Sequence, residues 1–396
     1  MAISKIIGSG LGTINSPVEF TSTATIAGNV TATSGLTVAG LPITGEATAG
    51  RNIIINGAMN VAQRSASVTG LGAAEGYFTL DRFVFSPTAT AGRATMSQVA
   101  DGPNGISANC LKLDCTTADA SIAAGESFNL QQRFEGQNLQ RIGKGVVGAK
   151  QITVSFYVKA SASFTFAIEL FDADNTRQIT KLFDTTTDWN RIELTFPADV
   201  DDGSSPFDDD NANSLFFVLQ LHAGSNFTSG TLNTASWANN TNANRYVGID
   251  SFFSNTANNF FLTGVQLEVG PVATEFEQED FGVTLAKCQR YFHSNVFASG
   301  KTCSAGGCVN SSTISVNAGM THPVLMRASP TASFSDATHF AVRHRNVATV
   351  CTALALGADP RSSYWQGTVS SGLTVGDGTF GRSADNACTL SFDAEL

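Results

Sequence analysis

Between residues 150 and 200 the chain repeatedly alternates large apolar residues with polar ones. The apolar members of three such runs are Ile152, Val154, Phe156 and Val158; Phe164, Phe166, Ile168 and Leu170; and Ile192, Leu194 and Phe196. A period of two puts successive side chains on opposite faces of a strand, so the pattern predicts strands with one buried face. Asp172–Asn175 predicts a turn between two of them. Short strands at this spacing predict an antiparallel sandwich or jelly roll over about residues 51–278.

One segment departs from alternation. Leu215–Leu221 is almost entirely apolar, which predicts a central strand that is covered on both faces.

A single convincing helix is predicted over residues 279–292. Asp280 can cap its start with Glu279 beside it, and Lys287 and Arg290 lie toward its end, as the helix dipole favours. The spacing of four apolar residues predicts one buried stripe along it. They are Phe281, Leu285, Cys288 and Phe292. The stripe is long enough to pack on the sandwich or to meet its own copies near a three-fold axis.

The pattern returns to short strands over residues 293–396, which predicts a second, smaller β domain at the distal end. The expected strands are Ser312–Val316, Ala332–Ser335, His339–Arg343 and Leu390–Asp393. Glycine-rich breaks are expected to separate them at Gly306-Gly307 and at Gly376–Gly378.

Residues 1–50 carry an eight-residue repeat, Thr23–Val30 against Thr31–Val38. One copy cannot bury its own apolar side chains, so the repeat favours a stalk that stacks on copies of itself. A flexible Thr/Ala/Gly linker is the alternative. Ile3, Ile6 and Ile7 precede flexible glycines and predict a segment that anchors on a larger assembly.

The charge content excludes several partners. The net charge is −10, only 14% of residues are charged, and the 23 Lys and Arg residues form no basic cluster. Nucleic acid and anionic membranes are therefore disfavoured, because both need clustered cations. No apolar run is long enough to span a bilayer, and residues 1–8 lack the apolar stretch of a secretory signal.

The seven cysteines form an odd set without a C-x-x-C motif. Synthesis in a cytosol favours free, largely buried thiols. A disulfide between Cys303 and Cys308 stays open, because Gly306 and Gly307 could close a tight loop there.

Three segments, in order along the chain, resemble phage tail-fibre proteins that contain a carbohydrate-binding-like β-sandwich. The first combines Asn52–Met59, Gln63-Arg64 and Tyr77–Phe83; the second combines Phe261–Phe276 and Cys288–Phe292; the third is Pro323–Pro330. The resemblance implies an all-β virion appendage whose stalk is a homotrimer that docks on other virion proteins through its N-terminus. It would be made in the host cytoplasm and carried on the tail. For Arg64, Asp81 and Arg82 we expect structural ion pairs.

Exposed aromatic rings with polar neighbours are typical of glycan sites. The candidates are Trp237, in a polar loop, with Tyr246, and the adjacent pair Tyr364-Trp365 in the distal domain. Neighbouring side chains on a strand face opposite ways, so one of Tyr364 and Trp365 should be exposed. Trp189, beside an alternating strand, is expected in the core.

Four acidic residues on one predicted loop are a possible calcium site, since calcium takes six to eight oxygen ligands. They are Asp199, Asp201, Asp208 and Asp210. The loop lacks a full calcium-binding motif, so a solvated acidic loop is the alternative. No carboxylate pair is singled out for glycoside hydrolysis, and no G-x-S-x-G motif is present. We therefore expect no enzyme and no required cofactor.

The sequence thus predicts passive attachment of a phage tail fibre to a host-surface glycan, with several copies acting together. The alternative is a head fibre, decoration or tail adaptor protein that has the same sandwich but binds no receptor.

Overall fold

The computed structural model describes residues 36–38, 41–43, 50–200 and 205–396. The chain divides into two compact units, Met1–Glu46 and Ala47–Leu396. In the first unit, β1 (Leu36–Val38) and β2 (Leu41–Ile43) form an antiparallel pair. Ile3, Ile6, Ile7 and most of the predicted stalk lie outside the described residues.

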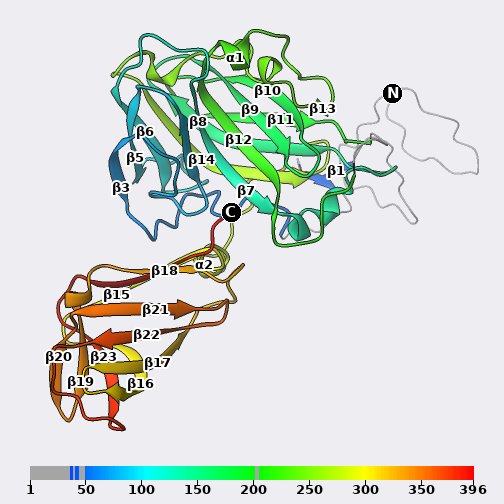
Figure 1. Cartoon of the computed structure of the whole chain (residues 1–396). Helices are drawn as coiled ribbons and strands as arrows, with labels where there is room; N and C mark the ends of the chain where they lie inside the picture. Colours follow the sequence, from blue (N-terminus) through cyan, green and yellow to red (C-terminus); the bar gives the residue numbers. More distant parts are fainter. Residues whose placement is uncertain (1–35, 39–40, 44–49, 201–204) are drawn as a thin grey trace, which may run out of the picture. The chain divides into compact units, whose positions relative to one another are not determined.

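The second unit is built mainly of antiparallel β-sheet, as predicted (Figure 1). Two six-stranded sheets form a sandwich. The first sheet, which we call sheet I, has the order β13 (Ala238–Asn239), β10 (Arg177–Asp184), β9 (Thr165–Asp172), β12 (Asn213–Ala223), β7 (Ser127–Glu135), β4 (Val84–Thr88). Sheet II has the order β11 (Asn190–Phe196), β8 (Ile152–Ala160), β14 (Asn259–Val269), β6 (Cys110–Thr117), β5 (Arg93–Val99), β3 (Ser67–Leu71).

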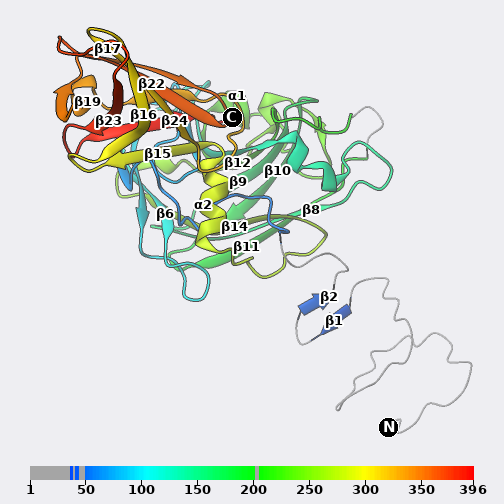
Figure 2. The ribbon, with the colours of Figure 1, turned by 90° about the horizontal axis from the view of Figure 1, so that it is seen from below.

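The chain passes between the two sheets repeatedly, as in a jelly roll: β8 lies in sheet II, β9 and β10 in sheet I, β11 in sheet II and β12 in sheet I. The two sheets face each other in both views (Figures 1 and 2). Alternate residues of each strand fill the space between them, as the period-two pattern predicts. The predicted runs at 152–158, 164–170 and 192–196 are confirmed as β8, β9 and β11.

Strand β12 is confirmed as the central, apolar strand. It pairs with β7 on one side and β9 on the other. Its inward residues, such as Leu215 and Leu219, are fully buried in the common core. Its outward side differs from the prediction, because Phe216 is only half-buried. This exception matters for the site described below.

The predicted helix is present but shorter than 279–292: α2 covers Phe281–Gln289. Asp280 occupies the N-cap position, yet its side chain makes no capping hydrogen bond. The expected apolar stripe is wrong in part, since Phe281 is exposed while Thr284 and Cys288 are buried. Glu279, which was expected to interact with the helix dipole, forms an ion pair with Lys287. Phe292 already begins the next strand.

The C-terminal β module contains a three-stranded and a seven-stranded sheet. The smaller sheet has the order β15 (Phe292–Phe297), β24 (Cys388–Asp393), β18 (Thr331–Phe334). The larger sheet has the order β20 (Val347–Val350), β19 (Phe340–His344), β23 (Gly378–Ser383), β16 (Thr302–Ser311), β17 (Ile314–Thr321), β22 (Ser362–Thr368), β21 (Ala353–Ala358). The module has its own core around Phe340 and Trp365.

One local prediction in this module is corrected, and one alternative that the sequence left open is decided. Gly306 and Gly307 do not break the chain but lie inside β16, where they pair with neighbouring strands. Cys303 is buried and Cys308 is exposed, so their side chains lie on different sides of β16 and form no disulfide. The described short helices are α1 (Ser225–Thr228) and the 3-10 turns Gly136–Asn138, Gln140–Ile142, Asn242–Asn244, Phe252–Ser254 and Ala337–His339.

The residues that carry the tail-fibre resemblance meet one another in space. Arg82 is fully buried, pairs with Glu395 and stacks over the Tyr291 ring at 3.5 Å. Arg64 pairs with Asp393 at 2.9 Å and lies 3.6 Å from the centroid of the Phe292 ring. The expected ion pairs of Arg64 and Arg82 are thus observed.

The same region contains three further polar contacts. Arg290 makes two hydrogen bonds to Glu135, of 2.8 and 2.6 Å. Arg327 donates to the carbonyl oxygen of Ala394 at 2.7 Å. Asp81 makes no ion pair in the described structure and instead accepts from Gln63. We call Arg64, Arg82, Glu135, Arg290 and Glu395 the joint, because they fasten the first sandwich segment, α2 and the C-terminus together.

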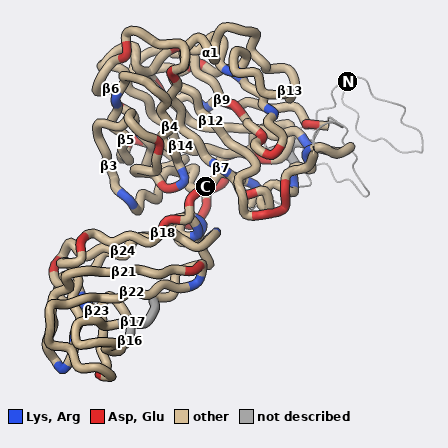
Figure 3. The backbone as a smooth tube through the Cα atoms, viewed as in Figure 1, with Lys and Arg blue, Asp and Glu red and all other residues tan. Residues whose placement is uncertain are grey.

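Among the described residues no helix is long and apolar enough to cross a bilayer. Figure 3 shows that charged residues are sparse along the strands.

Candidate functional site

Two phenylalanines lie side by side on the outer face of sheet I. Phe171 of β9 is the cross-strand partner of Phe216 of β12. Their ring centroids are 5.7 Å apart with a 30° tilt between the ring planes. The neighbouring residues Leu170 and Phe217 point into the core, so alternation directs both rings outward. Both rings are half-buried, which leaves apolar surface open to solvent.

A cation flanks each ring. The guanidinium of Arg245 lies 5.5 Å from the Phe171 centroid, and that of Arg133 lies 5.4 Å from the Phe216 centroid. Arg133 is also the cross-strand partner of Phe216 on β7. Phe171, Phe216, Arg133 and Arg245 therefore form a continuous line across the sheet, which we call the aromatic row.

One buried carboxylate and a tyrosine hold the Arg245 end of the row. Arg245 makes a two-pronged contact with Glu169, at 2.8 and 2.6 Å, and Tyr246 donates to the same carboxylate at 2.7 Å. Burial alone would lower the pKa of Arg245, but Glu169 outweighs it and raises that pKa above its usual value. Arg245 is thus a fixed cation whose position is set by Glu169.

The Arg133 end is held differently. Arg133 pairs with Glu75 at 2.6 Å and donates to the carbonyl oxygen of Leu396 at 2.9 Å. Gln131, two residues earlier on β7, is half-buried and accepts from the Arg133 Nε at 3.2 Å. The row therefore combines two half-buried apolar rings with guanidinium and amide groups close to them, and this combination can pack against a sugar ring and bond its hydroxyls.

Tyr246 and Trp237 do not present their rings as a glycan site requires. Tyr246 is 1% exposed and its hydroxyl is used by Glu169. Trp237 is 7% exposed and donates its indole N–H to the carbonyl oxygen of Pro197 at 2.9 Å. Both predictions of direct glycan contact are corrected: a buried ring has no free face. Tyr246 nevertheless supports the aromatic row through Glu169.

The Tyr364-Trp365 pair divides as its strand position predicts. Trp365 is 1% exposed and packs 5.9 Å from the Phe340 ring in the core of the C-terminal module, so it is corrected to a core residue. Tyr364 is 54% exposed. Its ring lies across Gly357, where an added Cβ would approach it to 2.3 Å. The Tyr364 ring occupies the space that a side chain at Gly357 of the neighbouring strand would fill. The role of Tyr364 in binding stays a prediction.

Of the four acidic residues of the predicted calcium loop, the structure describes Asp199, Asp208 and Asp210. Both carboxylate oxygens of Asp199 bond to Arg177, at 2.9 and 3.0 Å, in a buried cluster that includes Lys144. Asp208 and Asp210 are exposed, and Asp201 lies outside the described residues. Because Asp199 is committed to cations of the chain, it cannot serve as a calcium ligand in this arrangement.

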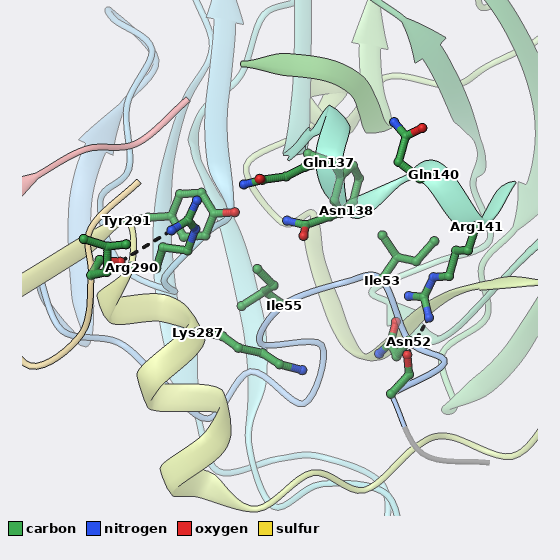
Figure 4. A pocket seen from close by; sticks show the side chains of 13 residues that line it. Asn52, Ile53, Ile55, Gln137, Asn138, Gln140, Arg141, Lys287, Arg290 and Tyr291 are labelled. Carbon is green, nitrogen blue, oxygen red and sulfur yellow. Dashed lines mark hydrogen bonds between the residues drawn. The ribbon is translucent and has the colours of Figure 1, made fainter. Parts of the chain in front are cut away.

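A pocket of about 780 Å³ lies near α2 (Figure 4). Amide and basic side chains line it: Asn52, Gln137, Asn138, Gln140, Arg141, Lys287 and Arg290. Its cations already have partners, since Lys287 pairs with Glu279, Arg290 pairs with Glu135, and Arg141 donates to the carbonyl oxygen of Gly50. Its two aromatic lining residues, Phe134 and Tyr291, are 3% and 1% exposed. The pocket suits a polar ligand but has no aromatic face for a sugar ring.

The outer face of sheet II contains a second aromatic cluster, which the sequence interpretation placed wrongly. Trp189 is half-buried rather than in the core, and its indole N–H donates to the carbonyl oxygen of Asp101 at 3.0 Å. Its ring lies 6.3 Å from Phe261. The ammonium group of Lys159 lies 5.1 Å from the Trp189 ring and 4.7 Å from the Phe261 ring. This cluster, like the aromatic row, combines aromatic rings with a nearby cation.

Sequence analysis missed Phe171 and Phe216 for separate reasons. Phe171 follows the last residue of the alternating run that ends at Leu170, directly before the predicted turn. Phe216 lies within a run that appeared fully covered. The signal that could have found them is the cross-strand register, which places them opposite each other. Register is a pairing property that one strand's sequence does not contain.

No protein-family model and no curated protein matches the chain. Solved structures match at low similarity. One is the enzymatically active domain of tailspike protein 4 of bacteriophage CBA120, with 12% identity, a TM-score of 0.29, and coverage of 55% of this chain and 21% of that one.

Two carbohydrate-binding modules also match. A family 61 module in complex with β-1,4-galactotriose has 12% identity, a TM-score of 0.26, and coverage of 56% of this chain and 99% of that one. A family 11 module from Clostridium thermocellum in complex with a mixed-linked tetrasaccharide has 12% identity, a TM-score of 0.26, and coverage of 53% and 99%. These TM-scores are too low for the likenesses to support a function.

Proposed function

We propose that this chain is a non-enzymatic attachment protein of a phage virion, and that its sandwich binds a host-surface glycan on the aromatic row. The observation that carries the proposal is the pair of half-buried rings, Phe171 and Phe216, with a fixed guanidinium at each side. The three sequence segments that resemble tail fibres supply the virion context.

The chemistry of the row favours a saccharide over other ligands. Pyranose rings present C–H groups on their faces and hydroxyls at their edges. The phenylalanine faces suit the first, and Arg133, Arg245 and Gln131 suit the second. Both cations have carboxylate partners, Glu75 and Glu169, so little net positive charge remains for a polyanion such as nucleic acid.

A single shallow platform of this kind gives weak binding, and several copies on one virion would compensate. We propose a homotrimer that docks through residues 1–50 on other virion proteins. No calcium is required at the 199–210 loop in this account.

The test is binding of the purified full-length chain to a panel of bacterial strains, with cells pretreated in two ways. Periodate, which cleaves vicinal diols of sugars, should abolish saturable binding, whereas protease should leave it intact. The opposite pattern would overturn the proposal that the receptor is a glycan. Soluble surface polysaccharide should also compete with the cells for binding.

One observation fits the structural alternative, a head fibre, decoration or adaptor protein, as well as it fits the attachment protein. The residues that carry the resemblance build the joint, and a virion protein without a receptor would need the joint equally. A stably folded full-length chain that binds none of the strains would support this alternative, and cross-linking on intact virions would then identify its neighbours.

A further inference from the structure

Three titratable side chains meet inside the sandwich, away from the aromatic row. Asp119 and Glu126 come from the segment between β6 and β7, and His222 from the end of β12. All three are buried, with exposed fractions of 5%, 7% and 0%. One ligand atom from each lies within 4.8 Å of the other two.

Two of these atoms have no hydrogen-bond partner. Glu126 Oε2 and His222 Nε2 are both buried without a donor or acceptor in reach, and they lie 3.6 Å apart. On the other side of the ring, His222 Nδ1 lies 2.8 Å from the Ser251 hydroxyl. If Nδ1 donates that hydrogen bond, the lone pair of Nε2 faces the carboxylate. Two acceptors then face each other in a buried space, which is costly unless a cation lies between them.

Hydrogen bonds favour the ionised form of the third side chain, Asp119. Asp119 Oδ2 accepts from the Thr90 hydroxyl at 2.8 Å and from the Ala91 N–H at 2.9 Å. Burial would raise the pKa of Asp119, but these hydrogen bonds outweigh it and lower that pKa. Burial and the neighbouring Asp119 raise the pKa of Glu126. Burial lowers the pKa of His222 and keeps the ring neutral, as a metal ligand must be.

The surrounding chain supplies no cation to balance the carboxylates. Over the described part of the chain, no lysine or arginine forms an ion pair with Asp119 or Glu126. One imidazole nitrogen with two carboxylates suits zinc and related transition metals, whereas calcium takes oxygen ligands alone. Ligands at about 2.1 Å from a tetrahedral ion lie about 3.4 Å from each other, close to the observed Glu126–His222 separation.

We propose that Asp119, Glu126 and His222 bind one divalent transition-metal ion of the zinc type. The ion would tie the β6–β7 segment to the end of β12 and so stabilise one end of the sandwich. This site is distinct from the predicted calcium loop and does not depend on the glycan proposal.

The experiment uses the full-length chain after removal of metals with a chelator. Calorimetric titration with zinc chloride should show one ion per chain, and zinc should raise the midpoint of thermal unfolding. Manganese should bind more weakly, and calcium at the same concentration should have no effect. A folded, chelated chain that binds neither zinc nor manganese overturns the proposal, as does binding of calcium in place of zinc.

Two variants locate the ion. Glu126→Gln removes the charge but keeps the shape, so the metal-free variant should be at least as stable as the metal-free parent. Its zinc affinity should fall by more than about 100-fold, the upper limit for groups that merely orient a ligand. The zinc affinity of His222→Gln should fall by a similar factor.

The matched control is His339→Gln, which changes a histidine near Asp385 in the C-terminal module and should leave zinc binding intact. Unchanged zinc binding in both Glu126→Gln and His222→Gln would assign the ion to another site and overturn the proposal.

Discussion

The joint and the aromatic row are built from the same chemistry, arginine beside an aromatic ring, yet they differ in burial. In the joint, Arg82 stacks on Tyr291 and both are about 1% exposed or less. In the row, Arg245 and Phe171 are both half-buried. A buried cation–π pair with a carboxylate partner holds chain segments together, whereas a half-exposed pair leaves a surface on which a ligand can lie. Burial, more than residue type, separates the two roles.

The largest effect should come from Arg82. The change Arg82→Met leaves Glu395 buried without its main partner, since burial already raises the pKa of Glu395 and Arg82 opposes that rise. We expect the free energy of unfolding to fall by about 3–5 kcal/mol, measured by urea denaturation. Arg345→Met is the control, because Arg345 is exposed, so loss of its pair with Asp377 should reduce stability far less than loss of Arg82. Equal losses in both variants would remove the distinction between joint and surface.

The next largest effect is a pH dependence of the free energy of unfolding, caused by a histidine pair beside the joint. His293 and His322 are buried and their ring nitrogens lie 2.9 Å apart. Burial, aided by His322, lowers the pKa of His293 to about 4. In the unfolded chain the histidine titrates near 6.5, so the unfolded state takes up its proton first as the pH falls. Stability should therefore be full above about pH 6.5, decrease toward pH 4, and level off below.

Urea denaturation between pH 7 and pH 4 measures this slope, which for one group does not exceed about 1.4 kcal/mol per pH unit. His293→Gln should flatten it. A slope that is unchanged in His293→Gln would assign the acid sensitivity to other groups.

The smallest effect is expected at Tyr364. If recognition lies on the sandwich, Tyr364→Ala should change glycan affinity by no more than about twofold, the range of surface substitutions. The measurement is calorimetric titration with a saccharide that binds the parent chain. A loss of tenfold or more would move recognition to the C-terminal module, as the sequence alone suggested.

The sequence was a good guide to strands and a poor guide to exposure. The alternating runs identified β8, β9 and β11, and the apolar run identified β12, because burial of one or both faces is recorded in local periodicity. Exposure of single rings is not. Trp237 and Trp365 were candidates for glycan contact and are buried, whereas Trp189 was expected in the core and is only half-buried.

The candidate sites depend on contacts between residues far apart in the sequence. Phe171 and Phe216 meet through strand pairing, and Asp119 and His222 meet through the return of β12 past the β6–β7 segment. His222 is fully buried near the end of β12. Its unpartnered nitrogen facing Glu126 appears only in three dimensions.

The most direct test of the central claim compares matched phenylalanines on the two outer faces of the sandwich. Phe216 and Phe261 are both half-buried and both have a cation beside the ring. Glycan affinity is measured by calorimetric titration of the full-length chain and of Phe216→Ala and Phe261→Ala, each first shown to be folded. The account predicts that Phe216→Ala weakens binding at least about tenfold, or about 1.4 kcal/mol, while Phe261→Ala leaves it unchanged. Retention of affinity in Phe216→Ala, or its loss in Phe261→Ala alone, would contradict the account.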